Sequence, residues 1–334
     1  MDNARILILG VTASGKGRLA FELAKYLDAE IISVDSMKVY RRMDIGTAKP
    51  PTQARLQIPY HLIDVVEPGA PFSVARFLEL ANAAIRQIEN KNKPVVAVGG
   101  TALYIKTLLY GLFEGPGADE QIRNKLKAQA QNQGLDSLYE QLQRIDPGAA
   151  DRISRNDAKR IIRALEVYKL TGKPISTFQT QWDTQRTHDP SRQGVEPRQD
   201  AIRNTHSVRS PQDDWTIIGL RREKTEENKR INARVKKMID AGLLDEVKRL
   251  LAEPNPLGDQ ARCAIGYAEI TDHLAGKISL DDAIELIKKN TRKLAKAQRT
   301  WFKTFPNVHW LDLAPDETAE SILTRTKAIL KHET

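Results

Sequence analysis

The sequence predicts an α/β fold in which helices cover both faces of a parallel sheet, with an all-helical domain inserted between two strands. Short runs of valine and isoleucine alternate with segments of helical periodicity, a pattern typical of strands buried on both faces. The strand signal disappears between residues 115 and 178, where apolar residues keep only helical spacing. Such sheets bind ligands at the carboxyl ends of their strands, so we expect the functional site there.

The first strand leads into a phosphate-binding motif. The apolar run Ile6–Leu9 precedes residues 10–17, GVTASGKG, which match the pattern G-x-x-x-x-G-K, and a helical segment follows. In this context backbone N–H groups and the helix N-terminus face an anion, and Lys16 reaches its outer phosphate. The sheet is therefore expected to be P-loop NTPase-like. The candidate diphosphate-binding residues are Gly10, Thr12, Ala13, Ser14, Gly15, Lys16 and Gly17.

One position of this motif is unusual. Ser or Thr normally follows the lysine and its hydroxyl is a ligand of Mg²⁺, whereas Gly17 has no side chain. The sequence therefore predicts a phosphate site whose metal ligands are unknown. An ordinary glycine-rich turn between a strand and a helix is the alternative, and it does not explain the lysine.

The other elements follow from periodicity and capping residues. Strands are expected at residues 31–34, 61–65, 94–98, 215–220 and 308–311, and helices over 19–27, 74–88, 225–241 and 280–303. Ser279 and Asp282 form a capping box before the last of these helices. Asp35 and Thr101 both lie at the carboxyl ends of strands, Thr101 after two glycines, so we expect them to share one cleft with the glycine-rich turn.

The chain divides into three parts. Residues 1–114 and 214–334 are expected to form the catalytic core, residues 115–178 the helical insertion, and residues 179–213 a polar, mobile loop with no assigned function. The last helix of the insertion begins at Asn156 or Asp157, and Ile161, Leu165 and Tyr168 are expected to face inward.

The chain carries an excess of positive charge. It has 52 Lys and Arg against 43 Asp and Glu, a net charge of +9 and a pI near 9.4, which favours a polyanionic partner without requiring one. Two helices carry basic clusters: Lys159, Arg160 and Arg163 in the insertion, and Arg292, Lys296, Arg299 and Lys303 opposite an apolar face that includes Leu294. Each cluster alone is more often a solvated face, but together, beside an anion loop, they favour a surface for the RNA backbone.

Composition excludes several classes of protein. Cys263 is the only cysteine, so neither an internal disulfide nor a cysteine-rich zinc site is possible, which fits a reducing compartment. The sequence shows no basic-then-apolar leader and no apolar run approaching the ~20 residues of a membrane span. We expect a cytoplasmic protein with no membrane partner, present as a monomer.

Two roles stay open on spacing alone. Asp35 suits a helix cap or a holder of hydrated Mg²⁺ as well as it suits a catalytic base. Arg230 lies beside Arg234 in the first turns of a helix, where it is either ordinary surface charge or an arginine directed into the active site.

Several blocks of the sequence resemble the tRNA dimethylallyltransferases. The blocks lie at residues 10–16, 33–40, 43–50, 98–104, 163–172, 265–267 and 295–301, in order over most of the chain and outside residues 179–213. The block MDIGTAKP at residues 43–50 is far more specific than a phosphate loop. Relatives from eukaryotes often carry a zinc-finger extension, and its absence here fits a bacterial type of enzyme.

The resemblance implies that N6 of adenine 37 in the tRNA anticodon loop attacks the first carbon of dimethylallyl diphosphate and expels diphosphate, with Mg²⁺ as cofactor. It assigns Asp35 as the base, with Lys16 and Arg230 beside the diphosphate. The insertion is expected to close over the anticodon loop. The implied tRNA-binding residues are Asp35, Ser36, Met37, Lys38, Thr101, Arg123, Lys159, Arg160, Arg163, Arg262, Tyr267, Arg292, Lys296 and Arg299.

Three other functions are weighed against this one. A free-adenylate isopentenyltransferase shares the loop and the base but does not need the basic helices. A tRNA-binding protein that has lost catalysis is suggested only by Gly17. A small-molecule P-loop kinase is the third, and it would transfer a phosphoryl group from ATP.

Overall fold

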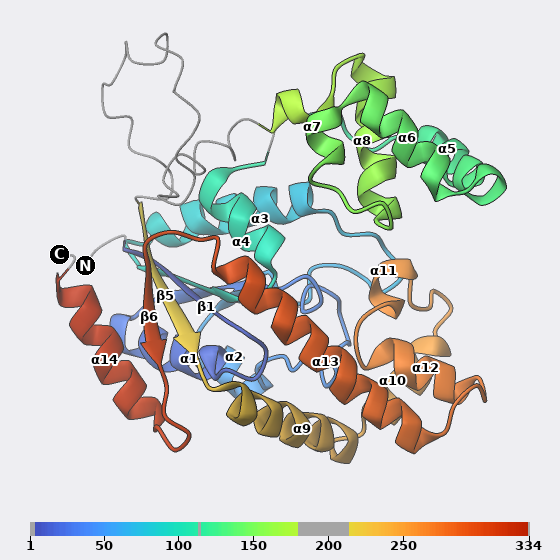
Figure 1. Cartoon of the computed structure of the whole chain (residues 1–334). Coiled ribbons are helices and arrows are strands. Elements are labelled where there is room, and N and C mark those ends of the chain that lie inside the picture. Colours follow the sequence, from blue (N-terminus) through green and yellow to red (C-terminus); the bar gives the residue numbers. More distant parts are fainter. Residues whose placement is uncertain (1–3, 113–114, 180–213, 333–334) are drawn as a thin grey trace, which may run out of the picture. The chain divides into compact units, whose positions relative to one another are not determined.

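A computed structural model describes residues 4–112, 115–179 and 214–332, and its core is a six-stranded sheet (Figure 1). All neighbouring strands pair in parallel, in the order β3-β2-β4-β1-β5-β6. The strands are β1 Arg5–Gly10, β2 Glu30–Val34, β3 Tyr60–His61, β4 Val95–Gly99, β5 Trp215–Arg221 and β6 Val308–Asp312. The predicted parallel sheet is confirmed.

Helices cover both faces of this sheet (Figure 1). Leu7 and Leu9 of β1 belong to one hydrophobic cluster, with Phe77 and Ile105, whereas Ile8 belongs to a second cluster on the opposite face. Successive side chains of a strand point to opposite faces, so a strand buried on both sides is apolar throughout. The helices of this unit are α1 Lys16–Leu27, α2 Thr52–Gln57, α3 Val74–Glu89, α4 Ala102–Tyr110, α9 Lys224–Asp240, α10 Leu243–Leu251, α11 Asp259–Arg262, α12 Tyr267–Leu274, α13 Leu280–Phe302 and α14 Ala319–His332.

The chain forms two compact units, residues 1–111 with 209–334, and residues 112–208. The described part of the second unit contains α5 Glu120–Gln133, α6 Leu135–Ile145, α7 Pro147–Ala150, α8 Ala158–Thr171 and the 3₁₀ turn η1 Ile175–Phe178. Its own core includes Leu126, Leu138 and Ile161. Asp157 caps α8 by accepting a hydrogen bond from the backbone N–H of Arg160 at 3.1 Å. Residues 180–213, most of the predicted polar loop, lie outside the described residues.

Three local predictions are wrong. The strand expected at residues 61–65 ends at His61, because Leu62 and Asp64 adopt left-handed φ values of 62° and 57° that break the ladder. Tyr168 is 36% exposed, since the core residues of α8 end one residue earlier, at Val167. Leu294 is 41% exposed, because the buried stripe of α13 runs along a neighbouring line of residues: Ala283, Ile287, Ala295, Gln298 and Phe302.

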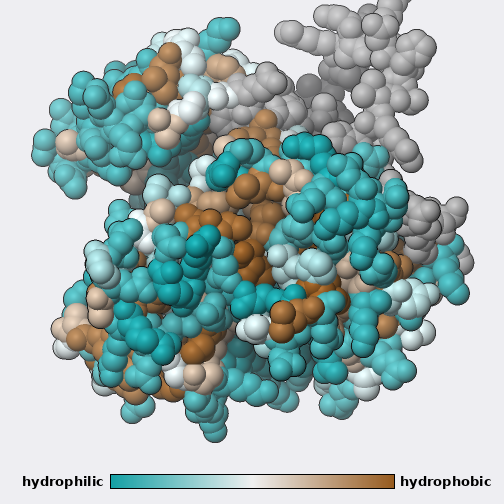
Figure 2. Space-filling view, turned by 180° about the vertical axis from the view of Figure 1, so that it is seen from behind, coloured by the Kyte–Doolittle hydropathy of each residue, from teal (hydrophilic) through white to brown (hydrophobic). Residues whose placement is uncertain are grey.

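The sequence is hydrophilic on average. The mean hydropathy is −0.47, and most of the face in Figure 2 is hydrophilic, with hydrophobic residues in separate patches. Within the described ranges, no helix is both long enough and apolar enough to cross a membrane.

Two glycines, one at the end of β4 and one in the first turn of α1, should respond very differently to replacement by alanine. A Cβ at Gly99 would overlap the backbone carbonyl of Val34 on the paired strand β2, whereas a Cβ at Gly17 meets nothing within 4 Å. We expect Gly99→Ala to lower the free energy of unfolding by more than about 3 kcal/mol. Gly17→Ala, inside α1, should leave it unchanged or raise it by up to about 1 kcal/mol. Urea denaturation followed by circular dichroism measures both, and equal midpoints would contradict this packing.

Candidate active site

The glycine-rich turn forms a tight loop between β1 and α1. Ala13 and Gly15 adopt left-handed φ values of 62° and 99°. The Ser14 N–H donates to the Val11 carbonyl at 3.2 Å. The Ser14 side chain is buried, with space for it only because Gly10 has no Cβ, and its hydroxyl has no partner among the described residues. The candidate diphosphate-binding residues thus run from the last residue of β1, through this loop, into the first turn of α1.

Two arginines hold the outer side of this loop. Arg230 of α9 donates through Nε to the Ala13 carbonyl at 2.9 Å, and Arg222 donates through Nε to the Ser14 carbonyl at 3.4 Å. Of the two places that the sequence left open for Arg230, the structure selects the one beside the phosphate loop. Arg222 was not predicted, since an arginine after a strand end carries no distinctive sequence signal.

Asp35 follows β2 and uses one carboxylate oxygen as a cap. Its Oδ1 accepts hydrogen bonds from the backbone N–H groups of Met37 at 2.9 Å and Lys38 at 3.2 Å. Its Oδ2 has no hydrogen-bond partner in the described part of the chain. Thr101, after β4, accepts at Oγ1 from the Ser36 N–H at 3.0 Å. One oxygen of Asp35 therefore fixes the turn, and the other is left for chemistry.

Gln298 of α13 joins the phosphate loop to the end of β4. Its Oε1 accepts from the Thr12 N–H at 2.9 Å, and its Nε2 donates to the Gly100 carbonyl at 2.8 Å. The side chain is buried. Gln298 belongs to the blocks that carry the resemblance, but its spacing indicated no role, because a buried amide cannot be distinguished from a surface amide by sequence position alone.

Positive charge gathers around the single carboxylate of Asp35. The Lys16 ammonium donates to the Val11 carbonyl at 3.1 Å, and its pKa is lowered to about 7. Removal of this ammonium from water is the main cause, followed by repulsion from Arg234 and Lys38, while attraction to Asp35 opposes the shift. Burial also lowers the pKa values of Lys38 and Arg234. The electrostatic interactions link the phosphate loop and Asp35 in one site that has an excess of cations and therefore favours an anion.

Comparison with known proteins decides the family. The sequence model described as "IPP transferase" matches residues 38–305. The chain belongs to the IPP transferase family. Family members named tRNA dimethylallyltransferase include one from Geobacter metallireducens, 43% identical over 307 residues and covering 92% of each chain, and one from Acetivibrio thermocellus, 40% identical over 331 residues and covering 99% of this chain and 98% of its own.

Solved structures of IPP transferases share the fold. The tRNA isopentenylpyrophosphate transferase of Bacillus halodurans aligns with a TM-score of 0.65 at 36% identity, covering 99% of this chain and 98% of its own. A eukaryotic dimethylallyltransferase acting on tRNA aligns with a TM-score of 0.71 at 24% identity, which shows the fold alone, covering 99% of this chain and 80% of its own.

The structure corrects the expected position of Tyr267. Its side chain is fully buried, and its hydroxyl donates to Glu246 at 2.5 Å. The same carboxylate accepts hydrogen bonds from the backbone N–H groups of Asp44, Ile45 and Gly46. Tyr267 therefore fixes the loop of this IPP transferase that contains the block at residues 43–50, and its side chain is not available as a surface contact for tRNA.

The basic ridge of α13 is partly occupied by contacts with α9. Arg299 forms an ion pair with the buried Glu227, and Arg292 donates to the Asn232 Oδ1 at 2.8 Å. Lys296 remains exposed, as does Arg262 at the end of α11. Two of the predicted tRNA-binding side chains thus also hold two helices together.

In the basic cluster of the helical insertion, too, some side chains form ion pairs within the protein and others are exposed. Arg123 and Arg163 both form ion pairs with the fully buried Glu166, at 2.9 and 2.7 Å. Lys159 and Arg160 are exposed. The ion pair between Arg123 and the buried Glu166 stabilises the packing of α5 against α8, so within this basic cluster only Lys159 and Arg160 remain exposed.

Arg234 also escaped prediction, although it lies one turn after Arg230 on α9. We expect Arg234→Gln to raise the pKa of Lys16 above about 7, because a repulsive neighbour is removed. In the protein without ligand, the Lys16 side chain is neutral at pH values above its pKa, and it must take up a proton to bind an anion. The affinity for pyrophosphate should therefore fall as the pH rises through the pKa of Lys16. Calorimetric titrations with pyrophosphate between about pH 6 and pH 9 should show that the affinity of Arg234→Gln falls at a higher pH than that of the unchanged protein. Lys237→Gln, an exposed charge on the same helix, is the control, and an equal shift in both variants would contradict the assignment.

Proposed function

We propose that this protein transfers a dimethylallyl group from dimethylallyl diphosphate to N6 of adenine 37 in the anticodon loop of tRNA and releases diphosphate. The observation that carries this proposal is the family membership, with about 40% identity to tRNA dimethylallyltransferases over more than nine tenths of the chain. The site supports it, since an anion loop and a carboxylate with one unpaired oxygen lie beside the same lysine.

The cations stabilise the leaving group. As the bond between the first carbon of the allyl group and its oxygen breaks, the diphosphate takes the bonding electrons and its negative charge increases. The backbone N–H groups of residues 13 and 15–17, for which the described structure gives no acceptor, would stabilise that charge together with Lys16 and Arg230. The lowered pKa of Lys16 rises again when the anion binds, because opposite charge favours the ammonium form.

Asp35 accepts the proton of the nucleophile. The lone pair of N6 is delocalised into the adenine ring, so the nitrogen attacks effectively only if its proton leaves as the new C–N bond forms. Oδ1 of Asp35 is held by two backbone N–H groups, which orients Oδ2 for this transfer. Extruding adenine 37 from its stack costs a few kcal/mol, which tRNA binding offsets.

Mg²⁺ is proposed to bind chiefly through the diphosphate. Mg²⁺ commonly uses one or two carboxylates together with substrate phosphates and water. Among the described residues no cluster of three or more His, Cys, Asp or Glu side chains could hold a metal ion, and Asp35 is the carboxylate beside Lys16. The unpaired Ser14 hydroxyl and Asp35 are the groups that would hold it, and the ion would neutralise charge on the diphosphate.

The proposal is tested by incubating the protein with tRNA, dimethylallyl diphosphate and Mg²⁺ and analysing the digested nucleosides by mass spectrometry. We expect a prenylated adenosine at position 37. AMP serves as the competing acceptor and ATP as the competing donor. Prenylation of AMP in preference to tRNA, or phosphoryl transfer without prenyl transfer, would overturn the proposed function.

Asp35→Asn separates the two roles of this side chain. The amide oxygen still accepts from the N–H groups of Met37 and Lys38, so the turn is kept, but the base is lost. We expect kcat to fall by about 10²–10⁴-fold while the Kd for tRNA changes less than about threefold. Single-turnover kinetics and filter binding measure these effects. A variant with nearly full activity would show that another group takes the proton.

Gly17→Ser tests the metal proposal, because the site has room for the hydroxyl that the motif usually carries. We expect the Mg²⁺ concentration at half-maximal activity to fall several-fold, since a ligand is added. Gly17→Ala changes the same backbone position without the hydroxyl and should resemble the unchanged protein. Identical metal titrations for the serine and alanine variants would argue that Mg²⁺ binds away from α1.

A further inference from the structure

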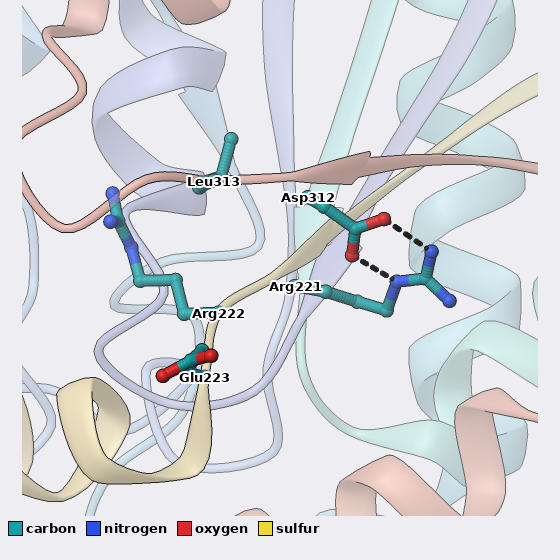
Figure 3. Close-up of a pocket in the computed structure, with 5 residues that line it drawn as sticks. All are labelled: Arg221, Arg222, Glu223, Asp312 and Leu313. Atoms are coloured by element: carbon teal, nitrogen blue, oxygen red, sulfur yellow. Dashed lines mark hydrogen bonds and ion pairs between the residues drawn. The ribbon is translucent and has the colours of Figure 1, made fainter.

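Strand β5 ends at Arg221, and the next residue is also an arginine, Arg222; their side chains point in opposite directions (Figure 3). Arg221 forms a bidentate ion pair with Asp312 of β6, with both N–O distances 2.8 Å. Its guanidinium also lies 4.9 Å from the centre of the Trp310 ring. Arg221 is therefore occupied in joining the two last strands of the sheet.

Arg222 points the other way and bridges two loops. Its Nε donates to the Ser14 carbonyl of the phosphate loop at 3.4 Å, and its Nη1 donates to the Ala314 carbonyl at 2.6 Å. Within the described ranges it forms no ion pair with a carboxylate. The two arginines border a pocket of about 520 Å³ lined by Arg221, Arg222, Glu223, Asp312 and Leu313 (Figure 3).

The loop that holds Arg222 is itself braced. Glu317, just before α14, accepts hydrogen bonds from the Ala314 N–H at 3.2 Å and from Arg325 at 2.9 Å. Arg325 also donates to the Asp312 carbonyl at 3.1 Å. These contacts attach residues 312–317 to both β6 and α14, so the Ala314 carbonyl is a fixed point on which the Arg222 guanidinium is anchored.

The bond from Arg222 to Ser14 determines the direction of a neighbouring N–H group. The Ser14 carbonyl and the Gly15 N–H belong to one planar trans peptide, so they point in opposite directions. A carbonyl held towards Arg222 directs the Gly15 N–H to the other side of the loop. Glycine tolerates several backbone conformations, and Gly15 has a φ of 99°, so this peptide needs an external contact to fix it.

We propose that Arg222 is a positioning residue for the diphosphate: it fixes the Ser14–Gly15 peptide so that the Gly15 N–H faces the anion. The inference rests on the proposed function only in taking diphosphate as the leaving group. Arg230 holds the preceding carbonyl, that of Ala13, in the same manner. Its guanidinium is close enough to Arg222 to lower the pKa of Arg222, after the larger effect of burial, so both side chains add positive charge behind the loop.

The adjacent arginine provides the matched control. Arg222→Gln and Arg221→Gln remove the same charge from neighbouring residues, but only the first removes the bond to Ser14. We expect Arg222→Gln to raise the Kd for inorganic pyrophosphate and the KM for dimethylallyl diphosphate by about tenfold, with the KM for tRNA unchanged. Arg221→Gln should leave all three constants within about twofold, because an exposed ion pair contributes little. Calorimetry and steady-state kinetics measure them.

Two further variants keep the test decisive if Arg222→Gln is poorly folded, which thermal melting would reveal. Arg222→Lys keeps the charge but has one donor nitrogen in place of the two, Nε and Nη1, that reach Ser14 and Ala314, so its constants should lie between those of Arg222→Gln and the unchanged protein. Glu317→Gln loosens the anchoring loop, and its effect on pyrophosphate affinity should disappear when Arg222 is already glutamine.

Equal losses in the two glutamine variants would show that only charge matters and would overturn the positioning role. Pyrophosphate binding by Arg222→Gln at full affinity would overturn it as well. If the unchanged protein binds pyrophosphate and shows the expected difference between variants, but leaves tRNA unmodified, the proposed function fails while the role of Arg222 stands.

Discussion

The uncompensated positive charge around Lys16 is the constraint on which the rest of the site depends. Lys16, Lys38 and Arg234 lie around one carboxylate, and their partial burial removes some of the water that would otherwise screen their repulsion. Such an arrangement costs folding free energy in the empty protein. Binding of an anion would recover this cost, so the site favours an anionic ligand over a neutral one.

The sheet and α13 bring these charges together. β4 pairs with both β1 and β2, so the phosphate loop after β1 and Asp35 after β2 lie on either side of the end of β4. Gln298 then connects the Thr12 N–H to the Gly100 carbonyl across that gap. The helix that carries the basic ridge, α13, is thus hydrogen-bonded directly to the glycine-rich loop, so the ridge and the loop share one support.

Much of the fold was predictable because each element is also determined locally. The continuous apolar run at Ile6–Leu9 indicates a strand buried on both faces, and Ser279 marks the start of α13 by its capping bond. The prediction of a strand at residues 61–65 was wrong because residues with left-handed φ values interrupt it. Leucine at position 62 is not a residue type that indicates this conformation. Leu294 was wrongly predicted to be buried. The buried side of α13 includes the polar Gln298, so it does not coincide with the side that has the most apolar residues.

The sequence by itself determined the parallel sheet, the phosphate loop, and the positions of Lys16 and Asp35, since these depend on periodicity and on a contiguous motif. Only the tertiary structure decided that Arg222, Arg234 and Gln298 surround the phosphate loop, that Arg299 and Arg163 neutralise buried carboxylates, and that Tyr267 is buried. The physical reason is that each of these contacts joins residues distant in the chain. A charged or amide side chain has the same local sequence signal whether it meets water, a carboxylate or a carbonyl, and only packing determines which one it meets.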